Sequence, residues 1–194
     1  MSEEAFLDWA TRNEVRAEWV EGEVIVMAPT NFEYQDICGW LYKLLSLYVE
    51  RNELGVAVLD VWTRLAKPRK QLRAPDVLFI SKSRLDITAT GKIDGPPDLI
   101  MEVVSHDSES RDWREKFYDY QGAGVREYWV IDPASHTQET YFLSSTGTYR
   151  RIEEIDDRIA SAVVPGFYIK PEWIWRTPRA KVLELLPELG IKLS

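Results

Sequence analysis

The chain has 194 residues, of which 45% are hydrophobic and 29% charged, a composition ordinary for a globular domain. Its length predicts one domain, spanning residues 1–194, that can bury a core of its own. The formal net charge of −8 argues against indiscriminate binding to nucleic acid. No stretch approaches the roughly 20 apolar residues of a membrane-spanning helix, and the N-terminus lacks a signal-peptide pattern. The single Cys38 excludes an internal disulfide, so we expect a cytoplasmic protein without a membrane partner.

The first half of the chain alternates helical and strand periodicities, separated by turn residues. In chain order it predicts a short helix (3–12), a β-hairpin (14–27), a long helix capped by Thr30 or Asn31 that ends near residue 51, a strand (56–65), a basic loop (64–73) and a second strand (76–80). Pro75 opens the last of them.

The second half predicts a loop, an apolar strand, a helix, a second buried strand and a hairpin. These cover residues 83–97, 98–104, 110–122, 126–131 and 140–152, and the tail from Arg179 is weakly helical. The order helix, three strands, helix, strand predicts an α/β protein whose mixed sheet carries helices on its faces. We expect a core of about residues 14–133 and a C-terminal β-hairpin extension of about 134–176.

Two carboxylates fall where strands are otherwise apolar. Asp76 begins one such strand, and Glu102 lies inside another. An ionised carboxylate there needs a partner, because burying it bare costs several kcal/mol or more. Three explanations account for Glu102 in this strand: a buried salt bridge, a protonated acid or a bound metal. The sequence alone favours the salt bridge over each of the other two.

Neighbouring strands would bring Asp76 and Glu102 together, where they repel each other unless a divalent cation lies between them. An oxygen-only site suits Mg²⁺ or Mn²⁺. The chain has only two His and one Cys, which are too few ligands for a typical zinc site. Such an ion suits phosphodiester hydrolysis, in which a nearby Lys stabilises charge or orients water. Val104 stands where a strand Lys would face the same side, so we expect Lys116 of the following helix to reach back.

Basic residues gather in two places. The segment from Arg64 to Arg73 holds five cations and no acid, and a second cluster holds Arg111, Arg114 and Lys116. Either cluster alone is most simply a solvated loop or helix face. In a protein that acts on nucleic acid, the first segment would steer the phosphate backbone.

Several motifs together resemble the Uma-two endonuclease family, a former domain of unknown function within the PD-(D/E)XK nuclease superfamily. The resemblance spans residues from about 14 to 166, and its longest string is its most specific part. The motifs are Glu18-x-x-x-Gly22-Glu23, Met27-Ala28-Pro29, Pro75-Asp76-Val77, Pro97-Asp98-Leu99-Ile100-Met101-Glu102-Val103-Val104-Ser105, Arg111-Asp112-x-x-x-Lys116 and Tyr120-x-x-Ala123-Gly124-Val125-Arg126-Glu127-Tyr128-Trp129-Val130-Ile131-Asp132-Pro133.

The resemblance implies a restriction-endonuclease-like αβββαβ core with added β-hairpins, and an endonuclease that hydrolyses DNA with Mg²⁺ or Mn²⁺. In the family pattern Asp76, Glu102 and the carbonyl of Val103 hold the metal. Lys116 matches a catalytic Lys that has moved to the helix, and Glu18 adds a carboxylate. The substrate-binding residues that we expect are Gln35 near the mouth of the cleft, Arg69, Lys70, Arg73 and Arg114.

Two positions depart from the family pattern. Tyr34 stands where many members have His, and His106 stands where many have Pro. The first change removes a possible proton-transfer or phosphate contact. The second places an imidazole beside the strand of Glu102, where it could take over that contact.

Other interpretations stay open. The chain could be an inactive nuclease-fold module that binds nucleic acid or protein, which the net charge and the missing strand Lys favour. Glu18 could pair with Arg16 or another cation, Asp98 could end its strand, and Glu127 could form a buried ion pair. A homodimer could form through the aromatic C-terminal hairpins, with Tyr141, Phe142, Tyr149, Phe167, Tyr168, Trp173 and Trp175 at its face.

Overall fold

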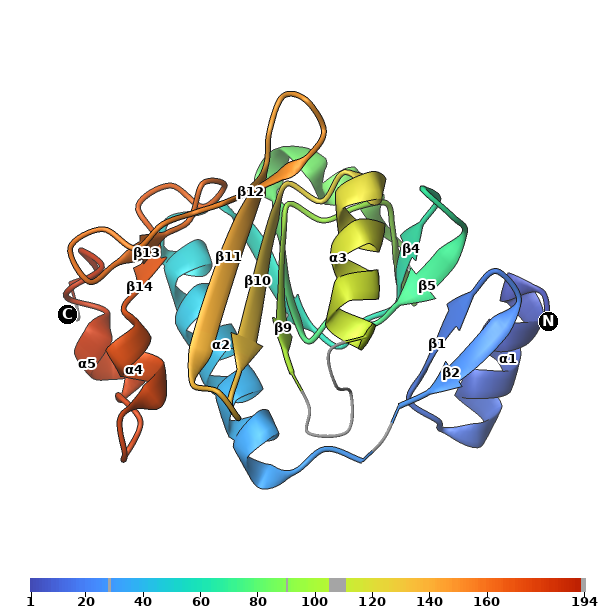
Figure 1. The fold of residues 1–194 in the computed structure, drawn as a ribbon, viewed down its shortest axis with the longest axis horizontal. Coiled ribbons are helices and arrows are strands. Elements are labelled where there is room, and N and C mark those ends of the chain that lie inside the picture. Colours follow the sequence, from blue (N-terminus) through green and yellow to red (C-terminus); the bar gives the residue numbers. More distant parts are fainter. Residues whose placement is uncertain (28, 90, 105–110, 193–194) are drawn as a thin grey trace.

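The computed structural model describes residues 1–27, 29–89, 91–104 and 111–192, which form two larger sheets and the helices around them (Figure 1). The first sheet has the strand order β12-β11-β10-β9-β6-β3. Its strands are β3 (Gly55–Leu59), β6 (Val77–Ser81), β9 (Leu99–Val103), β10 (Glu127–Asp132), β11 (Thr137–Leu143) and β12 (Tyr149–Arg151). Only β9 and β10 of this sheet pair in parallel, so the sheet is mixed, as predicted.

Two helices pack on opposite faces of this first sheet: α2 (Phe32–Arg51) and α3 (Arg111–Ala123) (Figure 1). Side chains alternate along a strand, and Met101 and Val103 belong to the hydrophobic cluster under α2. Glu102, between them, therefore faces α3. The chain order α2, β3, β6, β9, α3, β10 confirms the restriction-endonuclease-like αβββαβ core.

The second sheet is built mainly from the N-terminal part of the chain, in the order β2-β1-β5-β4-β8-β7. Its strands are β1 (Ala17–Val20), β2 (Glu23–Val26), β4 (Thr63–Leu65), β5 (Gln71–Arg73), β7 (Thr88–Ala89) and β8 (Lys92–Asp94), and helix α1 (Glu3–Asn13) packs against it. A 3₁₀ helix, η1 (Lys82–Ile87), precedes β7. Strands β1 and β2 form the predicted N-terminal hairpin.

The prediction of one strand over residues 56–65 followed by a basic loop is wrong. The strand divides at Asp60, whose left-handed backbone (φ 44°) sends β3 into the first sheet and β4 into the second. The basic segment forms an antiparallel hairpin, in which Arg64 lies opposite Leu72. The strand is not evident from the charged sequence, because one of its buried residues is a cation. Leu72 is completely buried, and its neighbour Arg73 is 1% exposed.

The C-terminal segment continues the first sheet and then covers α2. Strands β13 (Ile159–Ala160) and β14 (Tyr168–Ile169) and the short helices α4 (Pro171–Trp175) and α5 (Val182–Leu185) contribute to the same hydrophobic cluster as α2. Trp40 of α2 donates a hydrogen bond to the carbonyl of Ala180 at 2.6 Å. Among the helices that the structure describes, none combines the length and the apolarity that crossing a membrane requires.

Three of the aromatic residues predicted for a dimer face on the C-terminal hairpins pack inside the chain, whereas the other four are half-buried: Tyr141, Phe142, Tyr149 and Trp175. Phe167, Tyr168 and Trp173 are buried in the cluster around α2. Tyr141 and Tyr149 contact the ring of Phe117, at centroid distances of 4.9 and 5.1 Å. The oligomeric state stays a prediction without a surface assigned to it.

Candidate active site

The site is set by the pairing of β6 with β9, which places Val77 opposite Met101. Continuing that antiparallel register by one residue places Asp76 opposite Glu102. Directly opposed residues have Cβ atoms about 4.5–5.5 Å apart. Both acids are buried, with 4% and 6% of their surface exposed. The local sequence thus brings two carboxylates together, with Glu102 on the α3 face and Asp76 just before β6.

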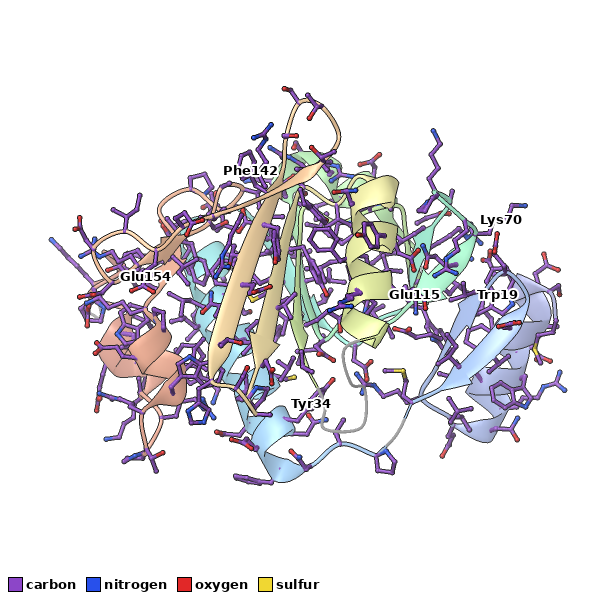
Figure 2. The ribbon with its side chains drawn as sticks, in the orientation of Figure 1. Trp19, Tyr34, Lys70, Glu115, Phe142 and Glu154 are labelled. Carbon is purple, nitrogen blue, oxygen red and sulfur yellow. The ribbon has the colours of Figure 1, made fainter. Side chains whose placement is uncertain are left out.

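Asp76 is held by three donors. Its Oδ2 accepts a hydrogen bond from the backbone amide of Val103 at 2.8 Å. Its Oδ1 accepts from the hydroxyl of Tyr34, in the first turn of α2 (Figure 2), and from Nη2 of Arg16 at 3.1 Å. Burial raises the pKa of Asp76, although the charge of Lys116 and these donors oppose the rise.

Glu102 is held by two side chains that lie one turn apart on α3. Lys116 places Nζ 3.0 Å from Oε2, and the hydroxyl of Tyr120 donates to Oε1 at 2.6 Å. Burial raises the pKa of Glu102, the charge of Lys116 opposes the rise, and the charges of Asp76 and Glu18 add to it. Each acid of the pair therefore has one salt bridge, Asp76 with Arg16 and Glu102 with Lys116.

Glu18 on β1 holds Lys116 from the other side. Its carboxylate lies 2.7 Å from Nη1 of Arg73, 3.1 Å from the amide of Ala74 and 3.6 Å from Nζ of Lys116. Against the effect of burial, the charges of Lys116 and Arg73 lower the pKa of Glu18 to about 2. The described residues contain no group of three acids, His or Cys that could hold a metal. Glu18 is joined to Glu102 through Lys116, and its part as a further carboxylate of the site stays a prediction.

Arg73 belongs to the interior, so the prediction that it binds substrate from an exposed loop is wrong. It is 1% exposed and forms salt bridges with Glu18 and with Asp119, the latter at 2.6 Å. Arg69 is also bound to Asp119, at 3.0 Å, but 28% of its side chain stays exposed. Figure 2 shows Glu115, a further partner of both arginines, on the side of α3 that faces the second sheet.

The other expected substrate contacts are surface residues. Lys70, Arg114 and Gln35 are exposed, and Gln35 donates a hydrogen bond to the hydroxyl of Thr30 at 2.7 Å. The structure does not gather them around the acid pair by any contact among the residues it describes. His106 and the side chain of Arg111 lie outside the described part of the chain.

Two other acids, Asp98 and Glu127, are held by structural hydrogen bonds. Asp98 accepts hydrogen bonds from the amide of Ser81 and from Arg84, at 2.9 and 3.0 Å. Glu127 accepts from the indole of Trp129, from Ser161 and from two backbone amides. The ion pair expected for Glu127 is wrong, because among the described residues its partners are neutral donors.

Sequence reasoning missed three residues that contact or support the site: Arg16, Tyr120 and Asp60. Tyr120 had a usable signal, because it lies four residues after Lys116 and such pairs share a helix face. Arg16 and Asp60 had none, because Arg16 meets Asp76, and Asp60 meets Arg16, only through tertiary packing. The sequence indicated Arg16 only as a possible partner of Glu18.

The residues present fit a hard divalent cation. Asp76 and Glu102 offer oxygen donors only, which is the set that Mg²⁺ and Mn²⁺ prefer. Their pKa values are both raised, so a further positive charge between them would be favourable. No cation among the described side chains forms an ion pair with both acids.

The αβββαβ fold with an acid pair at its sheet defines a protein of the restriction-endonuclease-like class. The chain belongs to the Uma2 family, described as "Putative restriction endonuclease", whose model matches residues 3–172. Among solved structures, it is similar to one described as "a putative nuclease belonging to DUF820" from Anabaena variabilis ATCC 29413, with a TM-score of 0.71 and 18% identity. That match covers 87% of this chain and 96% of the other. Comparison with curated proteins finds no match.

Proposed function

We propose that the protein is an endonuclease that hydrolyses phosphodiester bonds in DNA and requires Mg²⁺ or Mn²⁺. The observation that carries this proposal is the opposition of Asp76 and Glu102, both buried and both with raised pKa values. Arg16 pairs with Asp76 and Lys116 pairs with Glu102, and even with these cations beside them both acids keep raised pKa values, which supports a site for a further positive charge.

Each residue has a stated task in this proposal. Asp76, Glu102 and the carbonyl of Val103 hold the ion. When bound, the ion polarises a phosphoryl oxygen and lowers the pKa of a bound water. Lys116, fixed between Glu102 and Glu18 at 3.0 and 3.6 Å, stabilises the negative charge that develops on the phosphate, or orients the attacking water.

Substrate would be held by Lys70, Arg114 and the exposed part of Arg69, which would neutralise backbone phosphates, and by Gln35, whose amide would donate a hydrogen bond. A homodimer would present two such sites, one for each strand of a duplex, and sedimentation would test it. We expect an enzyme of this kind to act in the cytoplasm.

Cleavage of a supercoiled plasmid tests the proposal. Wild-type protein should cut it with Mg²⁺ or Mn²⁺ and not with EDTA. Glu102→Gln should lose at least about a hundredfold in rate, since it removes charge from the ion's ligand set. The matched control is Glu50→Gln, on the exposed face of α2, which should cut like the wild type. Equal cutting by Glu102→Gln and the wild type would contradict the proposal.

The second candidate keeps the fold without the catalysis: a module that binds nucleic acid or a protein. The net charge of −8 and Val104 in place of a strand Lys favour it. Calorimetric titration with Mn²⁺ separates the candidates. The enzyme should bind Mn²⁺ in a way that Asp76→Asn abolishes, whereas the module should show no site-specific binding.

A further inference from the structure

Arg16 lies at the rim of the acid pair and contacts it directly. Its Nη2 is 3.1 Å from Oδ1 of Asp76 and 3.5 Å from the hydroxyl of Tyr34. Its side chain is 27% exposed, whereas that of Asp76 is 3% exposed. Arg16 therefore extends from solvent to a residue that we propose as a metal ligand.

The guanidinium is fixed from its outer edge. Nε of Arg16 donates to both carboxylate oxygens of Asp60, at 2.9 and 3.0 Å. The amide of Asp60 in turn donates to the carbonyl of Pro75 at 3.1 Å, so this anchor is tied to the residue just before Asp76. The two terminal nitrogens are thereby directed toward the site. Within the described residues, Nη1 has no hydrogen-bond partner.

The other cations at the site are committed to protein carboxylates. Lys116 is 5% exposed and lies between Glu102 and Glu18, and Arg73 is 1% exposed. A substrate phosphate approaching from solvent would therefore meet Arg16 before either of them. Arginine also suits this task, because its guanidinium stays charged and can donate from Nη1 to a phosphate oxygen while Nε and Nη2 hold Asp60 and Asp76.

We propose that Arg16 binds a non-bridging oxygen of the phosphodiester at the acid pair, through Nη1, and orients that phosphate for attack. The inference rests on the proposed function, since it names the substrate contact of the same site. Asp60 is a positioning residue in this arrangement: it holds the outer edge of the guanidinium and touches no substrate.

The salt dependence of DNA binding tests the contact. Binding of a fluorescent duplex is measured by anisotropy over a KCl series with Ca²⁺, which takes the same oxygen donors, and gels verify that the DNA stays intact. One lost phosphate contact reduces the slope of log K against log salt by about 0.9. Arg16→Ala should show that reduction, with binding about tenfold weaker, and Arg16→Lys should restore the slope.

Two further variants guard against a folding artefact. Asp60→Asn keeps the charge of Arg16 but loosens its anchor, so it should weaken binding by less than Arg16→Ala and leave the slope unchanged. Arg12→Ala removes a cation on α1 whose side chain is 75% exposed and whose partner is Asp8. It should match the wild type in slope and affinity.

The outcomes separate this inference from the proposed function. If wild-type protein cuts plasmid and Arg16→Ala cuts and binds equally well, the inference fails and the function stands. If Arg16→Ala loses Mn²⁺ binding by calorimetry and keeps the wild-type salt slope, Arg16 acts through Asp76 and the inference fails. If wild-type protein neither binds nor cuts DNA with any divalent cation tested, both fail together.

Discussion

At the scale of single residues, the environment of Glu102 is set by one face of α3. Lys116 and Tyr120 lie one turn apart and take one carboxylate oxygen each. The ammonium group of Lys116 and the hydroxyl of Tyr120 fix the orientation of the carboxylate and lower the pKa of Glu102 against the effect of burial. Tyr120 is completely buried, so this orientation is protected from water.

Tyr120→Phe removes the hydroxyl that donates to Glu102 and keeps the ring. We expect Mn²⁺ affinity to fall about tenfold, because residues that orient a metal ligand have effects of that size. Stability should fall by about 1 kcal/mol, the usual net contribution of such a bond. Calorimetry and urea unfolding measure the two effects. Tyr118→Phe, 65% exposed on the same helix, is the control and should change neither.

The lowered pKa of Glu18 predicts a pH-dependent stability. Its folded pKa of about 2 lies below its ordinary value of 4.5, so its contribution is fully present above pH 4.5 and is lost as pH falls toward 2. The pH-dependent part is on the order of 3 kcal/mol. Urea unfolding of wild type and Glu18→Gln should therefore differ more at pH 7 than at pH 3. A difference that is equal at both pH values would contradict the prediction.

At the scale of elements, the hairpin of β4 and β5 is joined to α3 by ion pairs. Arg73 and Arg69 of the hairpin segment both pair with Asp119 of the helix. Because Arg73 continues into Ala74 and Pro75, the same contacts fix the segment that leads to Asp76. The basic segment thus contains a buried cation that stabilises the fold, Arg73, and an exposed one, Lys70.

Arg73→Ala and Lys70→Ala test that division within one hairpin. Arg73→Ala removes the closest cation from the buried acids Glu18 and Asp119 and leaves them Lys116 and Arg69, and we expect a loss of about 3–5 kcal/mol. Lys70→Ala changes an exposed side chain and should stay within about 0.5 kcal/mol. Urea unfolding followed by circular dichroism measures both. Similar losses in the two variants would contradict the division.

The sequence predicted the elements of the αβββαβ core because their periodicity and capping are local properties. Asn31, for example, caps α2 by accepting a hydrogen bond from the amide of Tyr34 at 2.8 Å. The division at Asp60 and the burial of Arg73 were not predictable, because both depend on which sheet each segment joins. At the site, strand pattern identified Asp76 and Glu102, whereas Arg16 meets Asp76 across 60 residues of chain.

At the scale of the whole molecule, the C-terminal segment closes the face of α2 that is opposite to α3. Residues from Tyr34 to Ile191 share one hydrophobic cluster there. The family match ends at residue 172, so much of this cover lies beyond the matched region. The cover packs on the α2 side of the first sheet, whereas Glu102 faces α3; Tyr34 belongs to the cluster of the cover and donates a hydrogen bond to Asp76. Because truncation of one C-terminal side chain leaves Tyr34 in place, we expect that the cover and the acid pair can be perturbed separately.

Leu185→Ala tests that separation. Leu185 is 4% exposed under α2, and its truncation should cost about 2–5 kcal/mol in the free energy of unfolding. The Mn²⁺ affinity of the remaining folded protein should be unchanged. Leu183→Ala, at a position that is 61% exposed, should leave both quantities as in the wild type. A loss of Mn²⁺ binding in folded Leu185→Ala would show that the two faces are coupled.

The amide of Val103 has an unusual partner for a strand residue, since it donates to the carboxylate of Asp76. Its neighbour Val104 donates to the carbonyl of Ile131, an ordinary backbone acceptor. Val103 is therefore a single-residue spectroscopic reporter: its amide resonance and exchange rate should follow the position of Asp76 while those of Val104 stay constant. Titration of the site could be observed at one backbone nitrogen, without substrate and without turnover.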